Sequence, residues 1–303
     1  MKKIIIGVDL GGTKIMTGAI NTTGKVLGTP VKVPTESHLP KEIILKKIID
    51  AIEKTISDLK LTIKDVAGIG IGTTGPLDIE TGVILECPQL PTMQFFPLRE
   101  AVQTYFGIPV SLNNDANCLI FGECIFGAAV HKKNVLGVTL GTGIGCAIVM
   151  DGKILNGATS TAGEIWTSPY QEGIMEDYIS GAGVSKIYKS ISGNDKSSLE
   201  IYQMAENGDV DALQTWAEFG THLAVPLVWT INIIDPEIVV LGGSIAAAYK
   251  FFKDTMEVNL RKRICPVPAE KTKVVLAQLG DYAGFIGAAC LLLENRKNRK
   301  EKQ

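Results

Sequence analysis

Several features that would assign the chain to a common protein class are missing from its sequence. No stretch reaches the roughly 18 uncharged apolar residues of a membrane helix, and the apolar run after Lys3 stops at Gly7, too early for a signal peptide. The six cysteines form no CxxC pair, so neither a zinc cluster nor a disulfide framework is indicated. The formal net charge of −2 gives no bulk attraction to nucleic acid or to an anionic membrane. These absences predict a cytoplasmic globular protein.

The sequence also lacks the most specific nucleotide-binding motif. No GxxxxGK[ST] occurs, which excludes a P-loop. Residues 70–75, GIGTTG, match GxGxxG after an apolar run, but the following Pro76-Leu77-Asp78 does not open the helix that a dinucleotide fold requires. A nucleotide site would have to be built from other turns.

Length and composition favour two domains. The 303 residues exceed the roughly 100–200 residues of one domain, and 46% of them are hydrophobic, enough for cores of ordinary size. The concentrated basic stretch at residues 295–303 is interpreted as a solvated helix end, with a weak anionic contact as the alternative.

An internal repeat organises these two halves. Residues 7–28 read GVDLGGTKIMTGAINTTGKVLG, and residues 137–157 read GVTLGTGIGCAIVMDGKILNG. Both copies contain an apolar strand, a glycine turn, a second strand, a Gly-Lys turn and a third strand. We therefore expect a β-meander at the start of each half.

The remaining segments alternate between helices and strands. Apolar residues at helical spacing predict a helix over residues 41–60, and continuous apolar runs predict buried strands over 66–72 and 110–112. In the second half we expect a helix over 210–234 that is kinked or broken at Pro226, a strand over 238–241 and a helix from about Ile245. The pattern predicts an α/β protein with a mixed sheet flanked by helices in each domain.

Three glycine turns are candidates for binding phosphate and adenosine. Glycines let backbone N–H groups approach anionic oxygens, and a strand-end Asp beside such a turn suits Mg²⁺, which often touches only one or two carboxylates. Ordinary hairpin and strand-to-helix connections are the alternative. The candidate residues are Asp9, Gly11, Gly12, Thr13 and Lys14 in the first turn, Gly141, Thr142 and Gly143 in the second, and Gly242, Gly243 and Ser244 in the third, with Asp9 as the metal-facing residue.

Asp115 is the candidate catalytic residue. It lies in the segment NNDAN at residues 113–117, directly after an apolar strand. Phosphoryl transfer to a hydroxyl needs a base beside that hydroxyl and neutralisation of the phosphates, rather than a covalent protein intermediate. An Asx turn that caps a helix at Asn117 is the alternative.

Six segments in order resemble the ROK family, whose name covers bacterial repressors, open reading frames and kinases. They are DLGGTK at 9–14, GIGTTGPLD at 70–78, NNDAN at 113–117, LGTGIG at 140–145, AGE at 162–164 and VLGGS at 240–244. The resemblance extends over nearly the whole chain. It implies an actin-like ATPase (ribonuclease-H-like) fold, ATP and Mg²⁺ as cofactors, a homodimer, and glucokinase-like transfer to the 6-hydroxyl of a hexose with Asp115 as general base.

The resemblance also implies the sugar-binding residues and the domains. The sugar is expected to contact Gly75, Gln89, Asn114, Asp115, Glu164, Thr167 and Glu176. The expected domains are residues 1–117, joined by a C-terminal helix over 284–303, and residues 118–283, with the boundary between Asn117 and Gly127.

Two segments depart from the family pattern. The usual AGEIGH reads AGEIWT here, so Thr167 replaces a histidine, and the cysteine cluster that normally follows is missing. No structural zinc is therefore expected. The usual PNLPGW begins with Pro88-Gln89, so Gln89 replaces an asparagine that contacts the sugar.

These departures leave the substrate open. A kinase for N-acetylmannosamine, fructose or allose is an alternative, and a noncatalytic sugar-binding regulator is an alternative of another class. A repressor of the family is disfavoured, because the Asp9 turn begins where a DNA-binding domain would be expected.

Overall fold

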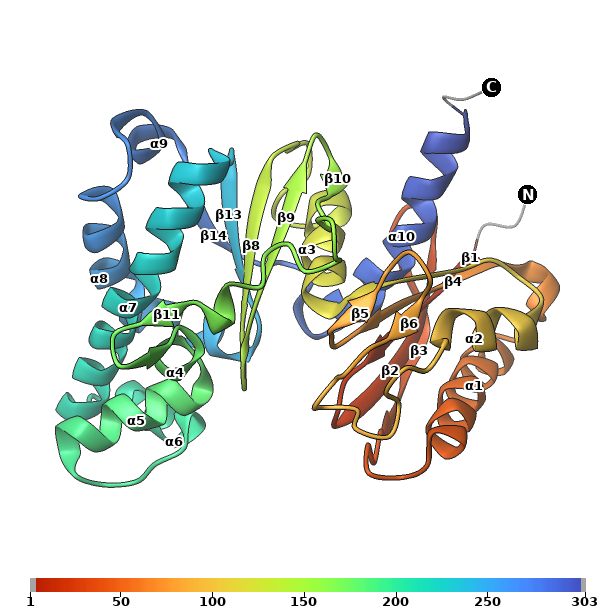
Figure 1. Cartoon of the computed structure of the whole chain (residues 1–303), viewed down its shortest axis with the longest axis horizontal. Helices are drawn as coiled ribbons and strands as arrows, with labels where there is room; N and C mark the ends of the chain where they lie inside the picture. Colours follow the sequence, from red (N-terminus) through yellow and green to blue (C-terminus); the bar gives the residue numbers. More distant parts are fainter. Residues whose placement is uncertain (1–3, 301–303) are drawn as a thin grey trace. The chain divides into compact units, whose positions relative to one another are not determined.

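A computed structural model describes residues 4–300, with side chains from Ile4 to Leu293, so the side chains of the basic stretch 295–303 lie outside the described residues. Within the described part, no helix is long and apolar enough to cross a membrane. The chain forms two compact units (Figure 1). The first contains the chain up to His131, Ile154–Ala162 and the chain from Gln278 onward, and the second contains Lys132–Lys153 and Gly163–Ala277.

The first unit is built on a five-stranded sheet in the order β3-β2-β1-β4-β7. Strands β1 (Ile4–Leu10), β2 (Lys14–Asn21) and β3 (Val26–Pro34) are antiparallel neighbours, which confirms the first predicted meander. Strands β4 (Val66–Thr73) and β7 (Val110–Asn114) run parallel to β1, as expected for buried apolar runs. After β4 the chain enters the short hairpin of β5 (Leu77–Asp78) and β6 (Val83–Ile84), which agrees with the rejection of a dinucleotide motif.

Helices cover this sheet. Helix α1 (Lys41–Asp58) buries its isoleucine face against β2 and β3, and α2 (Leu98–Phe106) precedes β7. Helices α3 (Asp115–Phe126) and α10 (Ala283–Lys300) pack against each other, and α10 lies beside β1 and β4 (Figure 1). The approach is close, because a Cβ on Gly7 would lie 1.8 Å from the carbonyl oxygen of Phe285. Short turns η1 (Ile63–Asp65) and η4 (Gly280–Tyr282) complete the unit.

The second unit repeats the same plan. Its sheet has the order β10-β9-β8-β13-β14 and is formed by β8 (Val135–Leu140), β9 (Ile144–Met150), β10 (Lys153–Ile154), β13 (Ile238–Gly242) and β14 (Lys273–Leu276). The meander again comes first, and the later strands add in parallel to β8. The internal repeat of the sequence is therefore a repeat of structure.

The helices of the second unit enclose its core around Trp216 and Phe219. They are α4 (Glu176–Ile179), α5 (Gly181–Ser192), α6 (Ser198–Glu206), α7 (Val210–Ile234), α8 (Tyr249–Arg261) and α9 (Pro266–Lys271), with η2 (Ile165–Thr167), η3 (Ser244–Ala248) and the hairpin of β11 (Pro169–Tyr170) and β12 (Gly173–Ile174).

Two local expectations in this unit need correction. Helix α7 continues through Pro226, so no break occurs there, because the buried neighbours Ala224 and Leu227 anchor both sides of the proline in the core. The helix expected from about Ile245 begins instead as the 3₁₀ turn η3 and becomes α-helical at Tyr249.

The division into units differs from the expected domain boundary. Residue 118 lies in the first turns of α3, and the first unit extends to His131. The physical reason is that α3 is buried against α10 of the same unit. Helix α10 belongs to the first unit, where the sequence placed the C-terminal helix.

Candidate active site

The parallel strands of the first unit bring its candidate residues to one edge of the sheet. In the strand register, Asp9 of β1 pairs with Gly72 of β4, and Gly72 pairs with Asn113 of β7. The next row joins Leu10, Thr73 and Asn114. Because all three strands end at this edge, the loops that follow them start side by side.

The first glycine turn, between β1 and β2, is held by backbone hydrogen bonds. The Gly11 N–H donates to the Lys14 carbonyl at 2.9 Å. Thr35, after β3, donates its hydroxyl to the Gly11 carbonyl at 2.6 Å and its N–H to the Thr13 carbonyl at 3.0 Å. A Cβ on Gly12 would lie 2.7 Å from the Gln89 carbonyl oxygen, so only glycine fits there. The protein itself therefore holds this turn in place through Lys14, Thr35 and Gln89.

Asp9 is a partly buried carboxylate at the start of this turn. Burial raises its pKa, and Lys14, whose Nζ lies 3.7 Å from Oδ2, lowers the pKa only in part. A bound cation would favour the charged form. Among the described side chains no three His, Cys, Asp or Glu residues could hold a metal by themselves. A single Asp beside a phosphate turn nevertheless fits Mg²⁺, whose other ligands are phosphate oxygens and water.

Asn114 and Asp115 lie where β7 passes into α3. The Asn114 side chain caps α3 by accepting the N–H of Ala116 at 2.9 Å and that of Asn117 at 3.4 Å. A helix cap is therefore present, as the alternative interpretation of this segment expected, although Asn114 forms it. Asp115 Oδ1 accepts the Ala116 N–H at 2.8 Å, which fixes its carboxylate at the N-terminus of α3.

Other candidate residues of the first unit lie beside this pair. A Cβ on Gly75 would lie 3.3 Å from Asn114 Nδ2, so the amide nitrogen of Asn114 faces the Gly75 loop. Burial raises the pKa of Cys118, and the charges of Asp115 and Asp9 raise it further, so both carboxylates act on one thiol. Gln89 approaches Cys87, with Oε1 3.6 Å from Sγ, and Asp115 likewise contributes to the raised pKa of Cys87. The structure thus gathers Asp9, Gly75, Gln89, Asn114 and Asp115.

In the second unit, two glycine turns meet at the ends of β8 and β13. Thr139 pairs with Gly242 in the register, and a Cβ on Gly141 would lie 4.0 Å from Ser244 Oγ. Gly243 has a φ of 86° and so close an approach to β8 that a Cβ would lie 2.3 Å from the Leu140 carbonyl oxygen. Only glycine meets both conditions.

Glu176 lies against the second glycine turn. Its Oε2 accepts the Ile144 N–H at 3.0 Å, and a Cβ on Gly143 would lie 2.5 Å from the same oxygen. The Gly181 N–H, at the start of α5, donates to the Gly141 carbonyl at 2.8 Å. In this structure Glu176 therefore supports the turn, and its expected contact with the sugar stays a prediction.

Glu164 and Thr167 lie at η2, which follows Gly163. Both are exposed. The indole N–H of Trp166 donates to Glu164 Oε2. Burial of Cys146 raises the pKa of its thiol to about 12, and the nearby charge of Glu164 adds to this increase. Trp166 was not predicted as a site residue; its position beside Glu164 in the unusual AGEIWT segment was the available signal.

The comparisons with known proteins place the chain in a family. The model of the ROK family matches residues 5–295. The chain belongs to the ROK family. A ROK relative, the glucokinase of Halalkalibacterium halodurans, is 28% identical over 98% of this chain and 97% of its own length. The N-acetyl-D-glucosamine kinase of Aliivibrio salmonicida is 30% identical over 94% of this chain and 98% of its own.

A solved ROK structure extends the likeness to the fold. The glucokinase of Streptomyces griseus, in complex with glucose and AMPPNP, has a TM-score of 0.81 and 26% identity, covering 96% of this chain and 99% of that chain. The predicted family and actin-like ATPase fold are confirmed, and so is the predicted enzyme class, that of a kinase.

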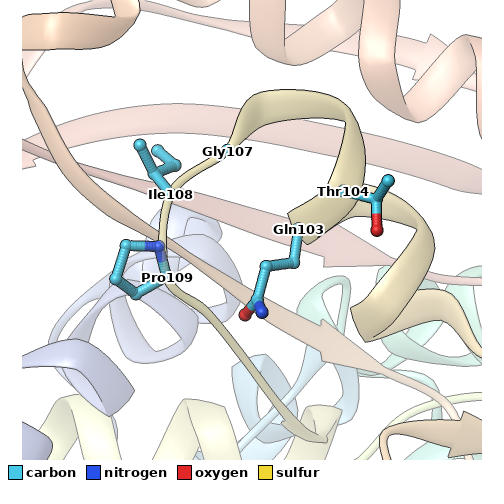
Figure 2. A pocket seen from close by; sticks show the side chains of 5 residues that line it. All are labelled: Gln103, Thr104, Gly107, Ile108 and Pro109. Atoms are coloured by element: carbon cyan, nitrogen blue, oxygen red, sulfur yellow. The ribbon is translucent and has the colours of Figure 1, made fainter.

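A surface cavity lies at the end of α2, away from the candidate site residues described above. It is lined by Gln103, Thr104, Gly107, Ile108 and Pro109 (Figure 2) and has a volume of about 550 Å³. Gln103 Oε1 accepts the Val110 N–H at 3.4 Å, so this side chain supports the start of β7. None of the five lining residues carries a charge, and the cavity has no part in the candidate site.

Proposed function

We propose that the chain catalyses ATP-dependent phosphorylation of a hexose or related sugar, most simply at the 6-hydroxyl as in a glucokinase. The observation that carries this proposal is the placement of Asp115. Its carboxylate lies at the end of β7 beside Asn114, on the same sheet edge as Asp9 and its glycine turn. The residues proposed as base, as sugar-contacting amide and as phosphate turn thus belong to one edge of one sheet.

In the proposed reaction, Asp115 accepts the proton of the attacking sugar hydroxyl. Asn114 Nδ2, facing Gly75, and Glu164 hold other hydroxyls. The turns at Gly11–Gly12 and Gly141–Gly143 hold phosphate oxygens through backbone N–H groups, and Gly242 to Ser244 binds the nucleotide. Asp9 would hold Mg²⁺, directly or through water, and the ion neutralises phosphate charge when bound.

The sugar is the open part of the proposal. The relatives named above are kinases of glucose and of N-acetyl-D-glucosamine by name, and both sugars carry hydroxyls that Asn114 and Asp115 would bind. N-acetylmannosamine, fructose and allose stay alternatives because Thr167 and Gln89 depart from the family pattern. A noncatalytic sugar-binding regulator is the alternative of another class. A homodimer and a cytoplasmic location stay predictions.

The deciding experiment measures coupled ADP release from MgATP with a panel of hexoses, their N-acetylamino forms and fructose. We expect one sugar to stimulate turnover, and Asp115→Asn to lower kcat by about 10²–10⁴-fold while sugar binding persists. Asp58→Asn is a matched control, because Asp58 is an exposed partner of Lys54 on α1.

Either of two results would contradict the proposal. A sugar that raises the melting temperature of the chain but never stimulates ADP release would favour the regulator. Full turnover in Asp115→Asn would remove that carboxylate from the role of base.

A further inference from the structure

A buried histidine outside the proposed reaction lies behind the segment that carries Glu164 and Glu176. His222 belongs to α7 and is only 8% exposed. Its Nδ1 lies 2.9 Å from the Tyr170 hydroxyl, and its Nε2 lies 3.7 Å from Glu218 Oε1. The neutral tautomer with its proton on Nε2 suits both neighbours, because Nδ1 then accepts the Tyr170 hydroxyl proton while Nε2–H faces the carboxylate.

A second tyrosine packs against this pair. The ring of Tyr178 has its centroid 5.1 Å from that of Tyr170 and 5.1 Å from that of His222. The rings of Tyr170 and Tyr178 are nearly perpendicular, at 89°, as in favourable edge-to-face contacts. Lys186 Nζ covers Tyr178 at 4.8 Å from the ring centroid. We call Tyr170, Tyr178 and His222 the Tyr-His anchor.

The anchor adds a polar contact to a segment that otherwise meets the core of its unit through Met175 and the partly buried side chains of Ile165 and Trp166. Residues 164–176 run from Glu164 through η2 and the β11–β12 hairpin to Glu176, and Met175 is the only one of them that is buried. Within the segment, the Met175 N–H donates to the Ser168 carbonyl at 2.9 Å. Tyr170, at the hairpin, supplies the side-chain hydrogen bond to α7, whose inner face is part of the hydrophobic core.

We propose that the Tyr-His anchor is a positioning device for the two carboxylates, Glu164 and Glu176, at the ends of this segment. The proposal rests on the proposed function, in which Glu164 holds a sugar hydroxyl and the second glycine turn, which Glu176 supports, holds phosphate. Its residues are positioning residues: none of them has to touch the substrate. A hairpin freed from α7 would let Glu164 sample more conformations, so sugar affinity would fall before phosphoryl transfer does.

The test compares variants that remove or keep the hydrogen bond. Tyr170→Phe removes the hydroxyl and keeps the ring; His222→Leu removes the acceptor; and His222→Asn places an amide oxygen near the former Nδ1. Tyr105→Phe is the matched control, because its hydroxyl donates to Glu53 at the same 2.9 Å on the surface of the other unit. Hydrogen exchange of the peptide over 164–176 and the sugar KM and kcat are measured for each.

We expect Tyr170→Phe and His222→Leu to speed exchange of that peptide and to raise the sugar KM by about 3- to 10-fold, the equivalent of one hydrogen bond, with kcat within about twofold. His222→Asn should restore much of the wild-type KM. Tyr105→Phe should change neither quantity. A variant that merely unfolds in part would instead lose kcat and keep its sugar KM.

The outcomes separate this proposal from the proposed function. Unchanged exchange, or faster exchange with an unchanged sugar KM in Tyr170→Phe, overturns the positioning role while the kinase stands. If the wild-type chain shows no sugar-dependent ADP release, the proposed function fails, and the role in sugar binding fails with it.

Discussion

The carboxylate of Glu123 accepts the backbone N–H of Leu279 at 2.8 Å, although the two residues are 156 positions apart. The same side chain accepts the N–H groups of Gln278 at 2.9 Å and Ala128 at 2.7 Å, and it is fully buried. Glu123 therefore fixes the end of α3 and the segment that leads into α10.

Replacing Glu123 by Gln should weaken this connection. The amide NH₂ would face backbone donors, so we expect the free energy of unfolding to fall by about 1–3 kcal/mol. A urea titration would report this as a lower midpoint at unchanged slope. Glu42→Gln, on the exposed first turn of α1, should stay within about 0.5 kcal/mol of wild type. Equal midpoints for both variants would contradict the prediction.

Asp9→Asn should separate stability from activity. Burial raises the pKa of Asp9, which means that its charged form is disfavoured in the folded chain, and this cost is present at neutral pH. The neutral amide should raise the free energy of unfolding by about 0.5–2 kcal/mol, as single stabilising substitutions do. ADP release should fall at the same time, since the proposed Mg²⁺ would lose its carboxylate ligand. A loss of stability in thermal unfolding would contradict this account.

Gly243→Ala should damage the proposed nucleotide-binding turn by two routes. The φ of 86° strains any side-chain residue, and the new Cβ would meet the Leu140 carbonyl. Gly152→Ala isolates the first route, because Gly152 has a φ of 74° with nothing within 4 Å of its Cβ. We expect both variants to lose stability by about 1 kcal/mol or more, and only Gly243→Ala to raise the KM for MgATP. Equal ATP kinetics in the two variants would be the contrary result.

Protonation of His222 should make stability depend on pH. Burial lowers the pKa of His222, while Glu218 raises it in part; the Tyr170 hydroxyl and the Tyr178 ring lie against the imidazole, and Lys186 lies over Tyr178. The unfolded chain therefore binds this proton first as pH falls. The stability contribution is complete above the ordinary value of 6.5 and declines as pH falls toward the folded pKa. Urea midpoints between pH 7.5 and 5 should fall more steeply for wild type than for His222→Asn.

The cysteines offer a simple check of the packing. All six lie in the described part of the chain, and Cys265 is exposed while the other five are buried. Burial raises the pKa of Cys124 and Cys146 to about 12, so these thiols remain protonated and unreactive. A thiol reagent at pH 8 should rapidly label one site in the native chain, and Cys265→Ser should abolish that reaction. Rapid labelling of that variant would mean that buried thiols are accessible.

The parts of the fold that depend on local pattern could be predicted from the sequence. Helix α1 has one apolar face with a period of 3.6, and each meander consists of apolar runs separated by glycine turns, so these patterns identify them. Helix α3 is apolar on most of its surface, with Ala116, Ile120 and Cys124 all buried, and such a helix gives no periodicity. The expected boundary at 117 and 118 therefore missed its packing against α10.

The candidate site likewise contains residues that could be predicted from the sequence and contacts that could not. Asp9 and Asn114 lie at the carboxyl ends of β1 and β7, and Asp115 follows β7, so the topology of a parallel sheet brings them together. The contacts of Trp166 with Glu164, and of Tyr170 with His222, join residues whose relation depends on the path of irregular loops and on tertiary packing. No regular spacing of residues along the chain indicates such contacts, so they could not be predicted from the sequence.

Helix α10 lies on β1 and β4, strands made far earlier in the chain, and a Cβ on Gly70 would lie 1.8 Å from the Ala288 carbonyl oxygen. During synthesis, the second unit is complete once Ala277 has left the ribosome, whereas the first lacks a covering helix until α10 emerges. The half made first is therefore the half finished last. A stop codon near residue 280 would remove α10. The sheet that carries Asp9 and Asn114 would then lose its covering helix, and its apolar face would be open to chaperones and proteases.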